Sequence, residues 1–393
     1  MRLTSAKIGL VALTVGCIGK DTEPDNLDLS DCSEAGTICT IAGTGNAAYN
    51  LQDAQAKETA LNRPSALAFA PDGKLLINDQ MNLLIRQLES DGTLSTVAGN
   101  RSATYAQNGP AAESPLKYIT DVVRGPGTSL YLAESEGPRV LELDMSGSEA
   151  QIQVLAGEPG VYGYDPDDPE ISYEATMLDR INGLAVGPDG VIYMSMGISE
   201  SNIGVIRAFD PSESHDAGAG TGSVWTVMGV DADGYPNGAL GSPQKMAFYD
   251  GDLYVADSSL HGVARIDVDT QEIEWVVGAV SVDEDGAATG NPGYAGDGAT
   301  MDEVVLNTPY AVIFDEGRMM IADSGNHAIR AQLSDGTFDT IVGRGPTGYA
   351  GDGESAENAS LTFPQDIAIG ADGDLMIADT NNAVVRWVSE PTW

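Results

Sequence analysis

The sequence predicts an all-β fold, a six-bladed β-propeller whose ring is closed by an outer strand from its own N-terminal segment. One unit, two apolar runs joined by a turn rich in Asp and Gly, recurs six times along the 393 residues. Each of the first five copies is followed by a strand that ends in glycine, whereas the sixth runs into the C-terminus. A segment with the missing pattern stands ahead of the first copy. Four short strands in each repeat are typical of a propeller blade.

The clearest copy of the unit lies near the C-terminus. Residues 361–369 form an alternating run, residues 370–373 contain an Asp-Gly turn, and the second run ends at Asp379. This order is typical of a β-hairpin, and residues 381–388 follow it as a third strand. The same order recurs from Leu61 onward and around four further points, at Asp121, Asp189, Asp250 and Asp315.

The fourth strands determine how the ring closes. Five of them follow the first five units and end at Gly99, Gly157, Gly229, Gly278 and Gly343. The sixth is missing from the C-terminus, but residues 40–43 have the same pattern. We therefore expect this segment to be the outer strand of the last blade, which removes an open sheet edge. Every strand then belongs to a single propeller domain over residues 38–393.

The N-terminus has the features of an export signal. A basic stretch and a short apolar run precede Cys17, which predicts a signal peptide over residues 1–16. The run is too short to span a bilayer. Residues 13–17 resemble a bacterial lipobox, with Thr14 in place of the usual leucine, so Cys17 is the predicted lipidation site. Plain secretion with cleavage nearby is the alternative. Residues 17–37 then form the lipidated cysteine and an acidic tether.

The two remaining cysteines are close in sequence. Cys32 and Cys39 are separated by six residues that include Gly36, so they can close a small loop. In an oxidising compartment this spacing favours a disulfide. Lipidation of Cys17 would leave an even number of thiols, which agrees with this pairing.

The charge of the chain limits its partners. It has 19 basic and 59 acidic side chains, and its net charge is −40. Such a chain repels the phosphate backbone of nucleic acids, so we expect no nucleic-acid partner. Acidity spread over a folded surface mainly favours solubility and gathers cations.

A family resemblance appears at the turn after the second strand of each unit. Residues 323–330, from Asp323 through His327 to Arg330, resemble the NHL repeat motif. Residues 257–265 are a looser copy, and two further copies keep the acid and the arginine without the histidine. In the second and third units the aspartate is replaced by Glu134 and Ser195. The resemblance covers residues 38–393 and implies a six-bladed propeller.

The motif residues are interpreted as structural. An aspartate at the end of the second strand can accept hydrogen bonds from turn amides, and the arginine can return to it across the hairpin. His327 and its counterpart His261 are read as turn residues, because no set of histidines converges as a zinc site would need. The structural positions are Asp79, Arg86, Asp257, Arg265, Asp323, His327, Arg330, Asp379 and Arg386. No catalytic residue is predicted.

The start of each innermost strand is expected to line the central channel. There Asp121, Asn182 and Asp366 come from three blades and offer oxygen ligands suited to Ca²⁺. In this they loosely resemble the central calcium site of six-bladed lactonases and related hydrolases. The alternative is a polar, water-filled channel in which Lys245 balances an acid. We expect no cofactor, with Ca²⁺ as the alternative.

These observations favour a cell-envelope lipoprotein that acts as a binding or scaffold propeller for a protein or glycan partner. The alternative is a Ca²⁺-dependent hydrolase or lyase with its site in the channel. Propellers host both classes, so enzymatic activity stays open, although the sequence favours a binding protein. We expect an exported monomer on the periplasmic face or the cell surface, held to the membrane by its lipid anchor only.

Overall fold

The computed structural model describes residue 32 and residues 34–50, 53–162, 171–172, 178–198, 203–212, 223–229 and 238–389. The predicted signal peptide, the lipidation site Cys17 and most of the tether lie outside the described residues, as does His215.

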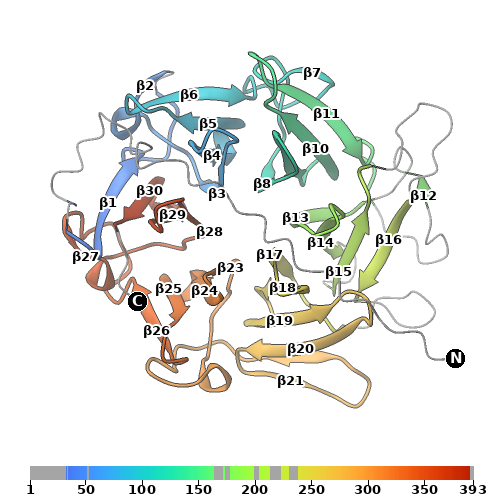
Figure 1. The fold of residues 1–393 in the computed structure, drawn as a ribbon, viewed down its shortest axis with the longest axis vertical. Helices are drawn as coiled ribbons and strands as arrows, with labels where there is room; N and C mark the ends of the chain where they lie inside the picture. Colours follow the sequence, from blue (N-terminus) through green and yellow to red (C-terminus); the bar gives the residue numbers. More distant parts are fainter. Residues whose placement is uncertain are drawn as a thin grey trace, which may run out of the picture.

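Six antiparallel sheets stand around a central axis and form a six-bladed propeller (Figure 1). Within each blade the three inner strands follow one another in chain order from the axis outward. The first blade comprises β3 (Pro64–Phe69), β4 (Leu75–Asp79), β5 (Leu84–Leu88) and β6 (Thr93–Ala98); the second β8 (Ile119–Arg124), β9 (Ser129–Glu134), β10 (Arg139–Asp144) and β11 (Gln151–Ala156); the third β13 (Arg180–Val186), β14 (Ile192–Ile198), β15 (Ile203–Phe209) and β16 (Ser223–Met228).

The remaining blades have the same order. The fourth comprises β17 (Pro243–Tyr249), β18 (Asp252–Asp257), β19 (Gly262–Asp267) and β20 (Glu272–Val277); the fifth β23 (Ala311–Asp315), β24 (Arg318–Asp323), β25 (Ala328–Gln332) and β26 (Phe338–Val342); the sixth β28 (Asp366–Ile369), β29 (Leu375–Asp379), β30 (Val384–Val388) and β1 (Thr37–Ala42). Short outer strands β2 (Ala54–Gln55), β7 (Gly109–Pro110), β12 (Ile171–Ser172) and β27 (Glu354–Ser355) extend four sheets, and β21 (Val280–Val282) pairs with β22 (Ala288–Gly290) as a separate hairpin.

The ring closes through the N-terminal strand, as the sequence predicts. β1 pairs antiparallel with β30, and Ile38, Cys39 and Thr40 lie opposite Val388, Trp387 and Arg386. Figure 1 shows β1 beside β30 although they come from opposite ends of the chain. Six inner triplets and six outer strands therefore make six complete blades.

Adjacent blades bury apolar side chains against each other. At the closure, Ile41 of β1 packs in one cluster with Leu67 and Ile77 of the first blade and Trp387 of the sixth. Ile41 is almost fully buried, at 2% exposure. Burial of such a side chain contributes about 1.5–3 kcal/mol, so the N-terminal strand holds the ring by its side chains as well as by its backbone.

The predicted disulfide is present at the start of the closing strand. Cys32 is bonded to Cys39, which lies within β1, and both side chains are buried. The link ties the segment that precedes β1 to the strand itself.

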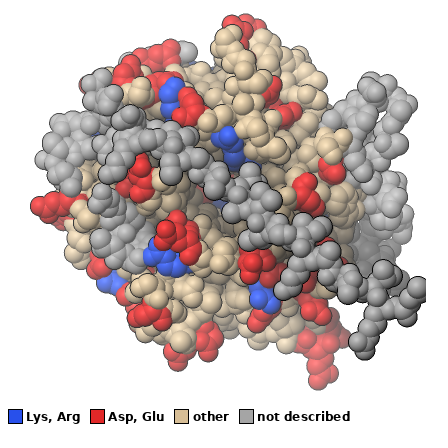
Figure 2. All heavy atoms as spheres, in the orientation of Figure 1, with Lys and Arg blue, Asp and Glu red and all other residues tan. Residues whose placement is uncertain are grey.

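Acidic side chains dominate the face seen in Figure 2. Asp and Glu are spread over this face, and Lys and Arg stand singly among them.

None of the described helices is long and apolar enough to cross a membrane.

Candidate ligand site at the mouth of the central channel

One aligned position of the six inner strands surrounds the axis. In chain order it is occupied by Ala66, Asp121, Gly183, Lys245, Ala311 and Asp366. Small and charged residues therefore alternate around the ring. The three charged side chains come from the second, fourth and sixth blades, and the small residues between them leave room for each to reach the axis.

The three charges form one buried ion cluster. The Lys245 ammonium lies 3.0 Å from Asp121 Oδ1 and 2.7 Å from Asp366 Oδ2, and all three side chains are at most 7% exposed. The carboxylates also bind neighbouring blades: Asp121 accepts a hydrogen bond from Leu184 N at 2.9 Å, and Asp366 accepts one from Leu67 N at 2.7 Å. The axial cluster therefore links five of the six blades and fills the channel at this level.

Gly183 shows how tightly this level is packed. A Cβ atom at this position would lie 2.6 Å from the carbonyl oxygen of Gln244 and 2.8 Å from the Cα of Lys245. Both are backbone atoms of the next blade, which cannot move aside as a side chain could. A larger residue at position 183 would displace the strand that carries Lys245.

Burial governs the protonation of the axial cluster. It raises the pKa of Asp366 to about 6, with the attraction of Lys245 opposing the rise and the charge of Asp121 adding to it. For Lys245, burial acts to lower the pKa, but the charges of Asp121 and Asp366 outweigh it, so the pKa stays raised. Lys245 is therefore a cation at neutral pH and offsets one of the two carboxylates.

The structure brings two of the three predicted calcium ligands together. Asp121 and Asp366 face each other through the Lys245 ammonium, which lies where a cation bridging them would sit. The Asn182 side chain instead donates a hydrogen bond to the carbonyl oxygen of Pro243 at 2.9 Å. Among the described residues no group of three His, Cys, Asp or Glu side chains is placed to hold a metal. A calcium site here stays a prediction in which Lys245 competes for the position.

Beside the axial cluster, the residues that lead into the inner strands form the mouth of the channel. Arg63, Tyr118, Thr308 and Phe363 occupy one repeat position, and each directly precedes Pro64, Ile119, Pro309 or Pro364. Their φ angles are 56°, 53°, 52° and 56°, which is the left-handed region that side chains other than glycine rarely occupy. Such a conformation persists only where the surroundings enforce it.

The motif acids provide part of that enforcement. Asp79, Asp323 and Asp379 accept hydrogen bonds of 2.7–2.8 Å from the backbone amides of Asn62, Asn307 and Thr362, each the residue before a mouth position. Glu134 does the same for Lys117 N at 2.9 Å in the second blade, next to Tyr118. The buried acid of each of these blades therefore fixes the loop that presents the mouth residue of the same blade.

The motif histidines act on the next blade. His261 Nδ1 accepts a hydrogen bond from Thr308 N, and His327 Nδ1 accepts one from Phe363 N, both at 3.0 Å. Burial lowers the pKa of both imidazoles, which keeps the ring nitrogen free to accept. The sequence identified these histidines as turn residues but missed that each one positions a mouth residue of the following blade.

Four side chains from four blades converge at the mouth. The rings of Tyr310 and Phe363 meet edge to face, with centroids 5.3 Å apart. Burial raises the pKa of Tyr310, while the charge of Arg63 lowers it and Tyr118 raises it. Phe363 therefore contacts the Tyr310 ring, and Arg63 and Tyr118 lie near enough for their charges to affect the Tyr310 hydroxyl. All four are half-buried and leave part of their surface open at the mouth.

The motif arginines lie away from this mouth. Arg330 pairs with Asp297 at 2.8 Å, and Arg386 pairs with Asp352 at 2.6 Å. Arg86 donates to Thr96 Oγ1 at 2.7 Å. All three side chains are fully buried beside the outer strands. Arg330 and Arg386 tie the loop between blades to the sheet, whereas the bond from Arg86 to Thr96 joins two strands of one blade.

The expectation that Arg265 returns to Asp257 is wrong. Asp257 lies opposite Gly262, so the position that corresponds to Arg330 in the fifth blade is Ala264. Arg265 projects from the other face of β19 and pairs at the surface with Asp252 and Glu274. The spacing carried the signal, since Arg265 is eight positions after Asp257 whereas Arg330 is seven positions after Asp323. In the second blade Arg139 pairs directly with the buried Glu134.

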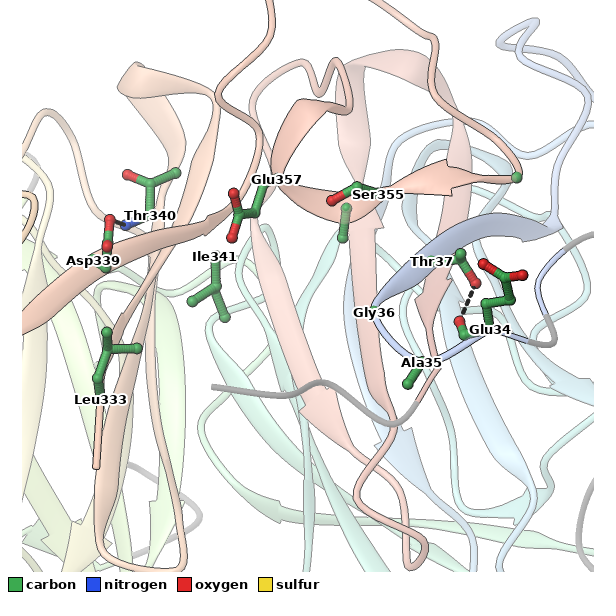
Figure 3. Close-up of a pocket in the computed structure, with 12 residues that line it drawn as sticks. Glu34, Ala35, Gly36, Thr37, Leu333, Asp339, Thr340, Ile341, Ser355 and Glu357 are labelled. Atoms are coloured by element: carbon green, nitrogen blue, oxygen red, sulfur yellow. Dashed lines mark hydrogen bonds between the residues drawn. The ribbon is translucent and has the colours of Figure 1, made fainter. Parts of the chain in front are cut away.

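A cavity lies at the outer rim, between the fifth and sixth blades (Figure 3). It has a volume of about 420 Å³ and is lined by residues of β26, β1 and the segment that follows β27. Its acidic side chains Asp339 and Glu357 already share Arg344 as an ion-pair partner. Arg344 therefore offsets two of the three acidic side chains that line the cavity, the third being Glu34.

Several known proteins are similar in sequence to parts of this chain. It is 23% identical over 359 residues to the protein SUPPRESSOR OF QUENCHING 1 of Arabidopsis thaliana, which covers 89% of the chain and 27% of that protein. It is 28% identical over 244 residues to human teneurin-4, covering 55% of the chain and 8% of teneurin-4. NHL repeat-containing protein 2 of Bos taurus is 26% identical over 185 residues, or 39% of the chain and 23% of the relative. The chain thus spans about a quarter or less of these relatives, and no family model matches it.

Solved structures agree with the fold. A Bacteroides thetaiotaomicron protein of unknown function superposes with a TM-score of 0.64 at 16% identity, covering 89% of this chain and 74% of its own. An auxiliary nutrient binding protein of the same organism superposes with a TM-score of 0.63 at 17% identity, and the match covers 89% of this chain and 75% of that protein's chain. A streptogramin B lyase superposes with a TM-score of 0.50 at 14% identity, and the match covers 90% of this chain and 99% of the lyase chain. At these identities the likeness concerns the fold: the chain is a six-bladed propeller, and part of it is similar in sequence to an NHL repeat-containing protein.

Proposed function

We propose that this protein is an exported binding propeller, anchored to the cell envelope through Cys17, that holds a protein or glycan partner at the mouth of its channel. The observation that carries the proposal is the convergence of Arg63, Tyr118, Tyr310 and Phe363 from four blades. Aromatic rings with a polar group among them, held on a rigid frame, are typical of ligand sites.

The closed axis supports binding at the mouth over chemistry in the channel. Lys245 already contacts both carboxylates that a calcium-dependent hydrolase would use. A ligand bound at the mouth would therefore lie against this ion cluster, which closes the channel beneath it.

Export is supported by the sequence and by the disulfide. The lipobox-like residues 13–17 point to an envelope anchor, and Cys32 and Cys39 form a bond that persists in oxidising compartments. The auxiliary nutrient binding protein among the similar folds has a binding role in its own name.

The test is capture of partners with a mouth variant. The soluble fragment from Ser30 onward, carrying Tyr310→Ala and Phe363→Ala, is used beside the unchanged fragment on envelope extract and on a glycan array. Tyr249→Ala is the matched control, because Tyr249 is a partly exposed aromatic at the opposite end of an inner strand. We expect the mouth variant to lose its partners and the control to keep them. Full retention by a folded mouth variant would place binding elsewhere.

A further inference from the structure

We infer that the mouth binds an acidic saccharide, with Arg63 pairing with a sugar carboxylate while Tyr118, Tyr310 and Phe363 contact the sugar ring. The inference rests on the proposed function of the mouth and names the chemical class of its ligand.

Arg63 has no counter-ion among the residues that the structure describes, since none of their carboxylates lies within 4.0 Å of its guanidinium. Its Nε is buried with no hydrogen-bond partner, as are those of Arg330 and Arg386, so the missing carboxylate is what distinguishes Arg63. The chain has 59 acidic residues, and the buried arginines Arg139, Arg330 and Arg386 each pair with one or two of them. A half-buried arginine that is left unpaired in such a chain favours an external anion as its partner.

The backbone holds Arg63 at the mouth. Asp79 accepts from the amide of Asn62, the preceding residue, and Arg63 itself has a φ of 56°. Asp79 thus holds this loop by a hydrogen bond to a backbone amide and not by an ion pair with the Arg63 guanidinium. Preorganisation of this kind lowers the entropy that a ligand must overcome on binding.

The neighbours of Arg63 favour a ring-shaped ligand. Tyr310 and Phe363 meet edge to face, so their faces are inclined and form an apolar wall. The C–H face of a sugar ring packs on such a wall while its hydroxyls reach Tyr118, Tyr310 and Thr308. A carboxylate on the same ring can then take the fork of the Arg63 guanidinium in a bidentate pair.

The dimensions of the mouth favour a saccharide over an acidic protein. A stable protein interface buries about 800 Å² on each partner, whereas the mouth consists of a few half-buried side chains around a filled axis. The other cation at this repeat position is Arg180, whose side chain is exposed and whose charge acts to lower the pKa of Tyr162 in the loop between the second and third blades.

The experiment measures binding of matched pairs of oligosaccharides by calorimetry. The acidic members end in glucuronate, galacturonate or mannuronate, and the neutral members end in glucose, galactose or mannose. A hexaglutamate peptide is a third probe. The proteins are the fragment from Ser30 onward, its Arg63→Gln variant, and Arg265→Gln as a control on an outer surface arginine.

We expect at least one acidic member to bind about tenfold more tightly than its neutral counterpart. Arg63→Gln should remove this preference, and Arg265→Gln should keep it. Equal binding of acidic and neutral sugars at a site lost in Tyr310→Ala/Phe363→Ala would overturn the acidic class and leave the proposed function standing. Binding of hexaglutamate but no saccharide would overturn the saccharide. No binding of any probe would also overturn this inference, while partner capture tests the mouth independently.

Discussion

Thr40 of β1 lies directly opposite Arg386 of β30, so residues 346 positions apart in sequence are register partners in one sheet. The Thr40 hydroxyl is 2.8 Å from Tyr349 Oη and donates to Asp352, the acid that pairs with Arg386. The fifth blade has the same group within one continuous stretch, where Thr340 contacts Tyr294 and Asp297, and Asp297 pairs with Arg330. The N-terminal strand therefore supplies the threonine of this four-residue group in the sixth blade, whereas in the fifth blade all four residues come from one stretch of chain.

Thr40→Val tests how much the closure depends on this module. Valine keeps the shape but removes a hydroxyl that makes two hydrogen bonds, so the free energy of unfolding should fall by about 1–2 kcal/mol. Thr340→Val is the matched control, since it removes the same group away from the closure. We expect similar losses of stability, but earlier proteolysis at the N-terminal strand only in Thr40→Val. Identical proteolysis patterns would show that the closing strand is not the weakest edge.

Removal of the disulfide should loosen the same strand. Cys32 and Cys39 close a loop with a sequence separation of seven, and the chain-entropy account gives about 2 kcal/mol for a loop of this length. The Cys32→Ser/Cys39→Ser variant should therefore unfold at lower denaturant concentration, and the unchanged protein should match it once reduced. Equal midpoints for the oxidised protein and the variant would mean that the bond adds nothing to closure.

The architecture was accessible from sequence because it repeats. The Asp-Gly turns and the glycines that end the fourth strands recur six-fold or nearly so, and the count left one strand, residues 40–43, to close the ring. The disulfide followed from spacing and compartment. Arg265 was misplaced because it lies one position further along its strand than Arg330 does, and neighbouring positions of a strand project from opposite faces.

The site was less accessible because it depends on contacts between blades. Asp121, Lys245 and Asp366 could be aligned to the axis, but that Lys245 contacts both acids depends on side-chain reach. The role of His261 and His327 was hidden, since each one bonds to a backbone amide of the next blade. Arg63 gave no signal, because one arginine in front of a proline is an ordinary turn residue until the described part of the structure is seen to place no carboxylate beside it.

The buried motif acids predict that stability falls as the pH rises through the mildly acidic range. Burial raises the pKa of Asp323 from 3.8 to about 7, and those of Asp79 and Asp379 to about 6. The folded state thus binds more protons than the unfolded chain between these values, and the free energy of unfolding decreases with rising pH there. Each pKa unit corresponds to about 1.4 kcal/mol.

Thermal unfolding between about pH 4 and pH 8 checks this slope. Asp323→Asn should flatten it, because the amide does not titrate. Asp335→Asn, at an exposed turn where hydrogen bonds lower the pKa, should leave it unchanged over this range and controls for the loss of one negative charge. If the unchanged protein gains stability from pH 4 to pH 7, other contacts must stabilise the charged carboxylates enough to cancel the effect of burial on their pKa values.

Anchoring through Cys17 predicts the location of the protein after export. With the cysteine in place, the protein should sediment with membranes and leave them only with detergent, whereas Cys17→Ser should appear in the soluble fraction. Cys32→Ser/Cys39→Ser, with Cys17 intact, controls for the general loss of thiols. An unchanged protein that is fully soluble after export would disprove the lipid anchor and favour plain secretion.

Lys245 decides whether the axis can hold a metal. In the unchanged protein its ammonium contacts both carboxylates, and at an effective dielectric of about 20 a unit charge about 4 Å away contributes roughly 4 kcal/mol against a competing cation. We expect calorimetry to show no micromolar Ca²⁺ site in the unchanged protein. Lys245→Met leaves Asp121 and Asp366 facing each other without a counter-ion, which should lower stability by about 3–5 kcal/mol. Added Ca²⁺ should restore part of this loss in Lys245→Met and none in Lys245→Met/Asp121→Asn/Asp366→Asn. A micromolar site in the unchanged protein that Asp121→Asn/Asp366→Asn abolishes would favour the calcium-dependent enzyme over the binding propeller.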